Sequence, residues 1–264
     1  MADASPAPYA VVTGASSGIG YELAKVFAGH GFDLLIAAED ADISVVGTEL
    51  GALGAAVRAV QVDLATYEGI EQLYAAITVS GRPVDAVAIN AGVGVGGRFV
   101  ETDLAAERNL IALNVTSTVH LAKRVAVDMA RRGEGRILFT SSIASKMPAP
   151  FEAVYGASKA FVQSFSQALR NELADVGVSV TALLPRPTET EFFDRAGMAD
   201  TKVGASSKDD PAKVAEQGFE GLIAGKDQVL AGSLLSRLQG AASAITPEPM
   251  AVAAHRKLSE PGSA

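Results

Sequence analysis

The sequence predicts an α/β fold in which helices cover both faces of a doubly wound parallel sheet. Three observations favour this fold. Short apolar runs alternate with longer amphipathic segments from Tyr9 to Leu184. The short runs are continuously hydrophobic, as expected of parallel strands that are buried on both faces. A glycine-rich turn, which begins at Gly14, joins the first run to the first amphipathic segment.

The apolar runs give the predicted strands in chain order. These are residues 9–12, 33–37, 57–62, 84–89, 136–140 and 178–184, with a weak last strand at 228–231. Apolar residues at helical spacing give the predicted helices. These are residues 18–29, 42–53, 67–79, 104–131, 153–176 and 211–224. The alternation of the two sets predicts strand–helix–strand units in one parallel sheet.

The pattern changes after Leu184. Residues 185–210 are rich in Pro, Gly, Thr and charged residues, which predicts a mobile segment over the carboxyl edge of the sheet, with a lid at about 186–210. Residues 233–264 are predicted to be an irregular or helical tail. Because the chain shows no repeat and no interdomain linker, we expect residues 1–264 to form a single domain.

Charge and cysteine content exclude several function classes. The formal net charge is −8, from 22 basic and 30 acidic residues, so the chain lacks the basic stripe that binding to nucleic acid requires. The absence of cysteine excludes disulfides and thiolate chemistry. The three histidines lack metal-ligand spacing, so we expect no metal site.

The sequence also argues against a membrane protein. The N-terminal residues lack the pattern of a signal peptide, and no apolar stretch reaches the ~20 residues that span a bilayer. We therefore expect a cytoplasmic protein. A membrane-surface role would depend only on Leu234, Leu235 and Leu238, which we expect to pack on the body of the protein or on a neighbouring subunit.

The turn after the first strand is rich in glycine and serine. A strand that turns sharply into a helix needs residues without a Cβ atom, and the N–H groups of the helix N-terminus then favour a pyrophosphate. The alternative is a plain strand–helix turn. The position of this turn at the first strand–helix junction of the predicted sheet favours the binding of a dinucleotide. The candidate binding residues in the turn are Gly14, Ser16, Ser17, Gly18, Ile19 and Gly20.

Tyr155 and Lys159 lie four residues apart near the start of a predicted helix. Residues at this spacing share a helix face. A lysine ammonium favours the phenolate and so lowers the pKa of a neighbouring tyrosine, and such a tyrosine can exchange a proton with an alcohol oxygen. The alternative is a surface tyrosine beside a solvated lysine.

Together, these motifs resemble the short-chain dehydrogenase/reductase family, in its shorter single-domain branch. Besides the glycine turn and the Tyr–Lys pair, the chain has Asn90-Ala91-Gly92 after the fourth strand and Ser141-Ser142 after the fifth. Asn114 completes that family's Asn–Ser–Tyr–Lys tetrad. The motifs follow one another in the family's order and spacing, from the first strand to the threonines after the sixth.

The resemblance implies a Rossmann-like, dinucleotide-binding catalytic domain and a role for each matching residue. Tyr155 would be the general acid/base, Lys159 would lower its pKa and bind the nicotinamide ribose, and Ser142 would hydrogen-bond the substrate oxygen. Asn114 would bend the long helix and bind a water in the proton relay. The other implied cofactor contacts are Asp63 and Leu64 at the adenine, Asn90, Ala91 and Gly92 at the ribose, and Pro185, Thr188 and Thr190 at the nicotinamide. Asn90 has a structural alternative, because a loop asparagine often ties two strands together.

The predicted function is that of an oxidoreductase, which transfers a hydride between a nicotinamide cofactor and a carbonyl or secondary alcohol of a small-molecule substrate. The alternative is a non-catalytic dinucleotide-binding regulatory or scaffold protein on the same fold, which would not need Ser142 and Tyr155 together. The helices at 104–131 and 153–176 carry more apolar residues than one sheet face covers. We therefore expect a homodimer or homotetramer, as the pairing of these helices in the family also implies.

The end of the second strand predicts NAD, with NADP as the alternative. A carboxylate binds a ribose 2′-hydroxyl, whereas a 2′-phosphate requires arginine or lysine. Glu39 and Asp40 lie here, and two carboxylates would repel a phosphate dianion. Ser17 stands where family members that use NADP often carry a basic residue. Asp40 has the alternative of capping the next helix, and Ala38 occupies the position of the most familiar NAD-selective acid.

One position departs from the family pattern. Arg186 follows Pro185, where the family usually has a glycine that lets the backbone approach the nicotinamide. This arginine is expected either to point outward or to contact an anionic substrate or the cofactor phosphate. The predicted substrate pocket is mainly apolar, which favours a medium-sized hydrophobic or cyclic ketone or alcohol as the substrate. Lys146 and Arg186 leave an anionic substrate as the alternative. The candidate pocket residues are Val93, Ile143, Ala144, Pro150, Phe151, Phe192, Phe193 and Met198.

Overall fold

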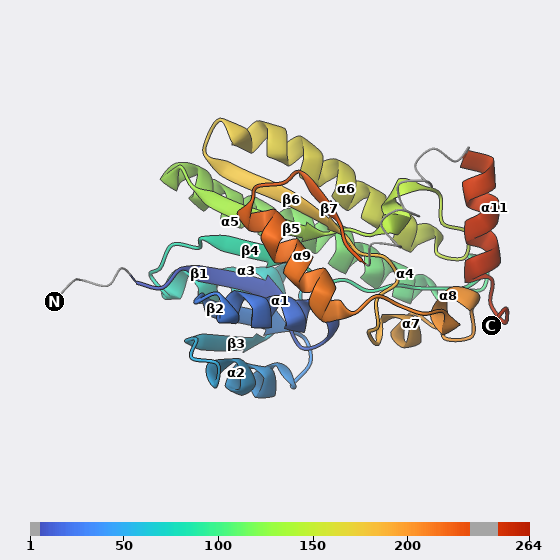
Figure 1. Ribbon diagram of the computed structural model, residues 1–264, viewed down its shortest axis with the longest axis horizontal. Coiled ribbons are helices and arrows are strands. Elements are labelled where there is room, and N and C mark those ends of the chain that lie inside the picture. Colours follow the sequence, from blue (N-terminus) through green and yellow to red (C-terminus); the bar gives the residue numbers. More distant parts are fainter. Residues whose placement is uncertain (1–5, 233–247) are drawn as a thin grey trace.

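The computed structural model describes residues 6–232 and 248–264, and its centre is a seven-stranded sheet with the order β3-β2-β1-β4-β5-β6-β7 (Figure 1). All six pairs of neighbouring strands are parallel, which confirms the predicted α/β fold. The strands are β1 (Tyr9–Thr13), β2 (Asp33–Ala38), β3 (Val57–Gln61), β4 (Ala86–Ile89), β5 (Gly135–Thr140), β6 (Val178–Leu184) and β7 (Gln228–Leu230). The strand order reverses between β1 and β4, and ligands of such sheets bind at the carboxyl end of that crevice.

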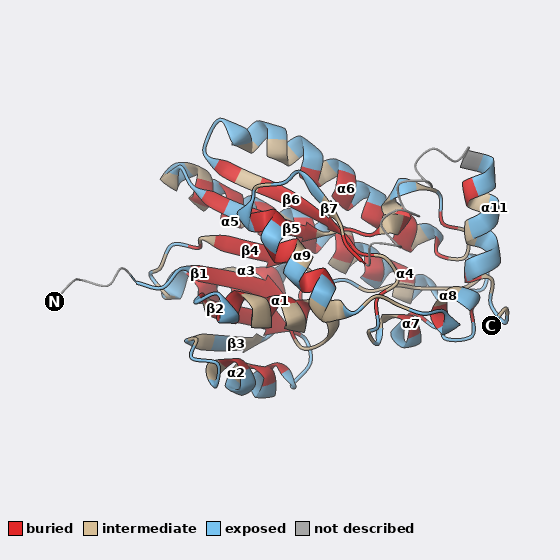
Figure 2. Cartoon of the chain, in the orientation of Figure 1, coloured by how far each residue is buried: buried red, intermediate tan, exposed pale blue. Residues whose placement is uncertain are grey.

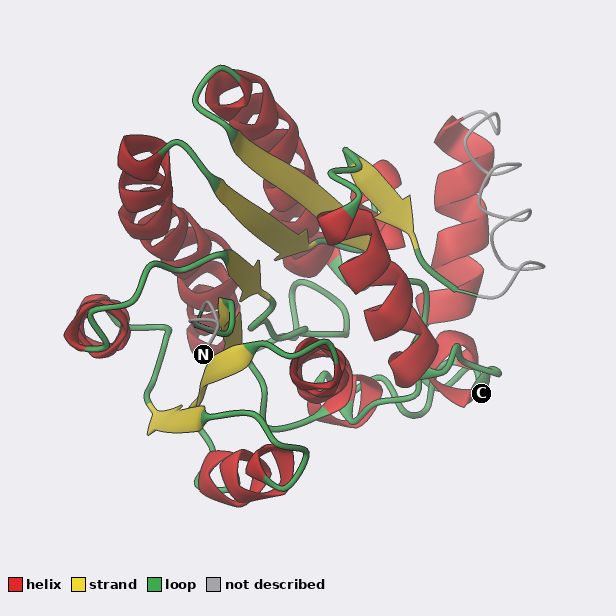
Figure 3. Cartoon of the chain, turned by 60° about the vertical axis from the view of Figure 1, so that its left-hand side comes forward, coloured by secondary structure: helices red, strands yellow, loops and turns green. Residues whose placement is uncertain are grey.

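Helices cover both faces of the sheet (Figure 3). One face packs against α1 (Gly18–Gly29), α2 (Ile43–Gly51) and α9 (Pro211–Ile223). The other packs against α3 (Tyr67–Val79), α5 (Thr118–Arg132) and α6 (Ala153–Ala174). Figure 2 shows the result: the central strands are buried between helices whose outer faces are exposed, while the edge strand β3 is only partly buried. Burial on both faces explains why the strands are continuously hydrophobic in sequence.

The predicted single helix at 104–131 is wrong in one respect, because a wide π-helical turn interrupts it. The chain forms α4 (Leu104–Ile111), a π-helical turn (Ala112–Ser117) and then α5. Asn114 lies in this turn and is buried. Its amide nitrogen donates to the Val93 carbonyl at 2.9 Å, and its amide oxygen accepts from the Val93 N–H at 3.0 Å. These two bonds hold the helix against the loop after β4, and a π-turn of this kind often lies at a functional site.

The predicted lid lies beyond the carboxyl ends of the strands, where α7 (Phe192–Arg195) and α8 (Lys202–Ala205) form (Figure 1). The sequence pattern did not predict these helices or their small apolar cluster, which consists of Phe193, Ala196 and Met198. The predicted mobility of this segment stays a prediction.

Part of the predicted tail forms α11 (Glu248–Ser259), which packs against α8. The residues after α11 bind the lid, because the Gly262 N–H donates to the Asp200 carboxylate at 2.8 Å and the Ala264 N–H donates to the Asp200 carbonyl at 3.0 Å. Leu234, Leu235 and Leu238 lie outside the described residues. Within residues 6–232 and 248–264, no helix has the length and hydropathy of a membrane span, and no cluster of histidine and carboxylate side chains could hold a metal.

Candidate active site

The carboxyl ends of the strands face a cleft of about 560 Å³, which is walled by the loops after the first six strands and by α11. The predicted catalytic and cofactor-binding residues converge here from distant parts of the sequence. Those that line the cleft are Gly14, Ser16, Ser17, Gly18, Ile19, Gly20, Glu39, Asp63, Leu64, Asn90, Ala91, Gly92, Ser142, Tyr155, Lys159, Pro185, Thr188 and Thr190. Asn114 is the exception and lies behind the wall, where it holds the Val93 backbone.

The glycine turn forms one end of the cleft, and each of its glycines is required by a close approach. A Cβ atom on Gly14 would lie 2.8 Å from the Ala91 Cα, and one on Gly20 would overlap the Gly14 carbonyl oxygen. Gly18 has a φ of 56° and lies against the Thr190 methyl group. Because no side chain caps the N-terminus of α1, its N–H groups remain available to an anion.

Asn90 ties three strands together. Its side-chain nitrogen donates to the Thr13 carbonyl at 3.1 Å, its side-chain oxygen accepts from the Thr140 hydroxyl at 2.9 Å, and its N–H donates to the Thr13 hydroxyl at 2.9 Å. Asn90 therefore ties strands together, as its structural alternative predicted. It also lines the cleft.

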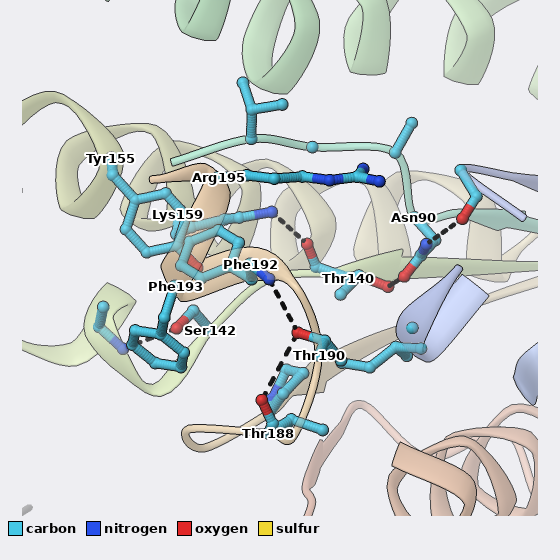
Figure 4. A pocket seen from close by; sticks show the side chains of 18 of the residues that line it. Asn90, Thr140, Ser142, Tyr155, Lys159, Thr188, Thr190, Phe192, Phe193 and Arg195 are labelled. Carbon is cyan, nitrogen blue, oxygen red and sulfur yellow. Dashed lines mark hydrogen bonds between the residues drawn. The ribbon is translucent and has the colours of Figure 1, made fainter. Parts of the chain in front are cut away.

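Tyr155, Ser142 and Lys159 form the opposite wall (Figure 4). Tyr155 and Lys159 share a face of α6 and are 8% and 6% exposed, with the Lys159 ammonium 5.8 Å from the centre of the Tyr155 ring. The ammonium donates to the Thr140 carbonyl at 2.9 Å. Ser142 caps the short 3-10 turn (Ile143–Lys146) that follows β5, where its hydroxyl accepts from the Ala144 N–H at 3.1 Å.

The predicted effect of Lys159 on the pKa of Tyr155 stays a prediction, and burial acts on that pKa in the opposite direction. Burial raises the pKa of Tyr155 above its ordinary value, Glu152 adds to the rise, and a hydrogen bond with Ser142 opposes it. Burial also lowers the pKa of Lys159 to about 8. The physical reason is that the same dry wall disfavours both charges, so the phenol is protonated at neutral pH.

Two carboxylates lie on the rim near the end of β2. Glu39 and Asp40 are exposed and line the cleft. The Ser16 hydroxyl donates to the Asp40 carboxylate at 2.9 Å, which connects this rim to the glycine turn. Asp40 makes no cap, since α2 begins after Asp42, whose side chain makes no capping bond either.

The loop after β6 crosses the cleft between its two ends. The Thr188 hydroxyl donates to the Arg186 carbonyl at 2.7 Å, and the Thr190 hydroxyl accepts from the Phe192 N–H at 3.3 Å, at the start of α7. Arg186 is half-buried and lines the cleft, and both predicted orientations of its side chain stay predictions.

A comparison with protein families identifies the family of this chain. The model of the family described as short chain dehydrogenase matches residues 8–200. The chain belongs to this family. This dehydrogenase is 32% identical over 206 residues to the oxidoreductase UcpA of Salmonella typhimurium, across 78% of this chain and 76% of that protein.

Solved structures of two dehydrogenases are similar to this one. A short-chain dehydrogenase from Sphingobium yanoikuyae in complex with NADPH has a TM-score of 0.79 at 30% identity and covers 90% of this chain and 93% of its own. A short-chain dehydrogenase/reductase from Burkholderia phymatum in complex with NAD has a TM-score of 0.76 at 25% identity and covers 85% of this chain and 88% of its own. The dehydrogenase is thus an oxidoreductase that uses a nicotinamide cofactor, and the non-catalytic alternative is not supported.

The substrate end of the dehydrogenase differs from the sequence prediction. Val93, Ile143, Ala144, Phe192 and Phe193 line the cleft as predicted. The other predicted pocket residues, which are Pro150, Phe151 and Met198, do not line it. Lys146 is also absent from its walls, because its exposed ammonium binds the Gln228 side chain at 3.1 Å.

Sequence reasoning missed a polar group in the cleft of the dehydrogenase. Glu152, His255 and Ser259 line it, although the last two are about a hundred residues from the catalytic motifs. Glu152 stands three residues before Tyr155, and this short spacing is the one signal in the sequence that could have indicated the polar group.

Proposed function

We propose that this chain catalyses reversible hydride transfer between a nicotinamide cofactor and the carbonyl or secondary alcohol carbon of a small molecule, with Tyr155 as the general acid/base. The observation that carries the proposal is the convergence of Tyr155, Ser142 and Lys159 on one buried wall, across the cleft from the glycine turn. A pure dinucleotide binder has no need of this wall.

The residues of the cleft fit a dinucleotide cofactor. The close approach at Gly14 and Gly20 leaves no room for side chains, and the uncapped start of α1 would hold the pyrophosphate. Asp63 and Leu64 would hold the adenine end, and Thr188 and Thr190 the nicotinamide end. When bound, the nicotinamide ring supplies or accepts the hydride.

Tyr155 moves the proton in this proposal. Its phenol is protonated at neutral pH because burial raises its pKa. During reduction, the phenolic O–H bond breaks and its proton passes to the carbonyl oxygen, which becomes the alcohol; oxidation reverses the transfer. Ser142 would donate a hydrogen bond to the same substrate oxygen as charge develops on it, and the Lys159 ammonium would favour the phenolate that forms.

The proposed activity is tested by the absorbance of the reduced cofactor with a panel of ketones and secondary alcohols. We expect turnover with members of the panel under both reducing and oxidising conditions. Cofactor binding without turnover across the panel would contradict the proposal.

We also propose NAD as the preferred cofactor. Glu39 and Asp40 on the rim support this choice, since a carboxylate suits a ribose 2′-hydroxyl and repels a 2′-phosphate. Because the two similar structures carry NADPH and NAD, the choice between them depends on these acids.

Changing both acids to arginine tests this cofactor preference. Glu39→Arg with Asp40→Arg is expected to shift the ratio of kcat/KM for NAD over NADP towards NADP by about tenfold or more, because attraction replaces repulsion, and a surface charge pair is worth ~1–4 kcal/mol. The matched control is Glu216→Arg with Glu220→Arg, which makes the same charge change on an exposed part of α9 outside the cleft. A wild-type enzyme that already prefers NADP would overturn the assignment.

We propose a homodimer or homotetramer. Apolar side chains are exposed on the helices predicted to pair, and these side chains are Leu104, Ile111, Val119 and Val127 on α4 and α5, and Phe161 on α6. Light scattering at micromolar concentration is expected to give two or four times the chain mass of 27.0 kDa. Phe161→Asp is expected to lower this mass, since burying a charge in an apolar interface is costly, and a monomeric wild type would refute the proposal.

We further propose that residues 1–264 form one catalytic domain and that the segment at about 186–210 is a lid over the nicotinamide end. The substrate is a small alcohol or ketone. The cytoplasmic location stays a prediction.

A further inference from the structure

A buried carboxylate lies beside the catalytic tyrosine and has no role in the proton transfer described above. Glu152 immediately precedes α6, and its carbonyl accepts the Gly156 N–H at 2.8 Å. The side chain is 6% exposed and lines the cleft. Tyr155 lines the same cleft, and the charge of Glu152 contributes to raising the pKa of Tyr155, so the carboxylate lies near the catalytic phenol.

A strained residue fixes the position of Glu152. Phe151 has a φ of 65°, the one positive φ of a non-glycine residue among the described residues. Its carbonyl accepts the Gly97 N–H at 2.8 Å. Its ring contacts two guanidinium groups, with Arg98 at 5.9 Å and Arg256 at 5.1 Å from the ring centre. Such a conformation is unfavourable for a residue with a side chain and persists where surrounding contacts enforce it, often at ligand sites.

The helix α11 supplies two polar partners from the far end of the chain. The Ser259 hydroxyl donates to the Glu152 Oε2 at 3.1 Å. The His255 Nε2 lies 3.5 Å from the same oxygen. Ser259 is 2% exposed, and both residues line the cleft. These contacts make Glu152, His255 and Ser259 one polar cluster in an otherwise largely apolar wall.

Among the described residues, no basic side chain pairs with this cluster. Within residues 6–232 and 248–264, no lysine or arginine forms an ion pair with Glu152. Burial lowers the pKa of His255, so its ring is neutral at pH 7. Burial also raises the pKa of Glu152 to about 7, so the carboxylate form becomes dominant as the pH rises above neutrality. Its Oε2 has both of the contacts named above, whereas a carboxylate can accept about four hydrogen bonds.

We propose that Glu152, supported by Ser259 and His255, is a substrate subsite that accepts a hydrogen bond from a hydroxyl or ammonium group of the substrate. This inference rests on the proposed function, because the donor would lie on the molecule whose carbonyl or alcohol oxygen is bound by Tyr155. The substrate class is then a ketone or secondary alcohol with a second, hydrogen-bond-donating group, in place of the wholly apolar compound that the sequence favoured. A donor at this position would add a hydrogen bond to the buried carboxylate, whereas a methyl group would leave its remaining acceptor sites without a donor from the substrate.

Matched ketones provide the test. The probes are cyclohexanones with a methyl, hydroxyl or amino group at position 3 or 4, assayed with the holoenzyme. We expect the wild type to favour a hydroxyl or amino compound over its methyl analogue by about tenfold to a hundredfold in kcat/KM, chiefly through KM, as for a hydrogen bond to a charged group.

Two variants separate the possible donors. Glu152→Met is expected to abolish the preference for either donor and to improve use of the methyl ketone. Glu152→Gln keeps an acceptor without the charge, so it is expected to retain the preference for a hydroxyl substrate and to lose that for an ammonium substrate. Glu172→Met, an exposed position on the same helix outside the cleft, is the matched control and is expected to behave as the wild type.

The outcomes distinguish the subsite from the proposed function. Each variant must bind the reduced cofactor within a few-fold of the wild type, which shows that the fold is intact. Equal use of the three substituents by the wild type, or an unchanged ratio in Glu152→Met, would overturn the subsite and leave the dehydrogenase activity standing. Turnover that survives the loss of the Tyr155 hydroxyl would instead overturn the proposed function.

Discussion

Tyr155→Phe is expected to lower kcat by about 10²–10⁴-fold, the usual contribution of a general acid/base, while the Kd for the cofactor stays within a few-fold. The variant removes only the hydroxyl that carries the proton. The ring still packs in its buried site, where it lies 5.1 Å from the Phe192 ring, centre to centre, so the cleft keeps its shape. Steady-state kinetics and a cofactor titration measure the two quantities separately.

A second tyrosine gives the matched control for this result. Tyr74 donates its hydroxyl to the Asp128 carboxylate at 2.7 Å and does not line the cleft. Tyr74→Phe therefore removes a hydroxyl of the same kind at no catalytic position, and kcat is expected to remain near the wild-type value. A Tyr155→Phe enzyme with normal kcat would show that the proton comes from another group.

Gly20→Ala is expected to reduce cofactor affinity by tenfold or more and to lower the Tm. The added Cβ would overlap the Gly14 carbonyl oxygen and approach the Asn90 side-chain nitrogen. Because the first of these is a backbone atom in a tight turn, relief requires the turn itself to shift. Overpacking of this kind typically costs ~1–3 kcal/mol, and each kcal/mol corresponds to about 2–4 °C of Tm for a domain of this size.

Gly29 provides the comparison on the same helix. It ends α1, its φ is not positive, and a Cβ atom there would meet no atom within 4 Å. Gly29→Ala is expected to raise stability by up to ~1 kcal/mol, because alanine loses less conformational entropy than glycine in a helix. Thermal unfolding and a cofactor titration of both variants test the pair. Similar behaviour of the two would mean that the glycine turn tolerates a side chain.

The fold and the catalytic wall could be predicted from the sequence because their signals are local. The runs that became β1, β2, β4, β5 and β6 are largely buried, so each carries its own hydrophobic signal. Tyr155 and Lys159 are brought together by the helix between them, and the loops that carry Ser142 and Asn90 each follow a strand. The carboxyl ends of parallel strands meet at one edge, so correct strands bring these residues together.

The parts that were missed depend on contacts between distant residues. Nothing near Ser259 in the sequence indicates that it will reach Glu152, which is 107 residues away. The π-helical turn at Asn114 lies where its side chain binds the Val93 backbone, a contact that the periodicity of the helix does not reveal. The pKa of Tyr155 depends on both kinds of contact: the spacing to Lys159 is local and favours a lower pKa, whereas burial, which raises the pKa, is a property of the whole cleft.

The bonds between Asp200 and the residues after α11 bear on how quickly a ligand can leave. Gly262 and Ala264 bind Asp200, and the Lys202 N–H donates to the Ser263 hydroxyl at 3.2 Å. These few hydrogen bonds join α11 to the lid at exposed positions, whereas the sheet is held by extensive apolar burial. Local opening at such positions requires far less free energy than global unfolding. The residence time of a bound product can therefore be set by the separation of two peripheral segments, independently of the stability of the sheet.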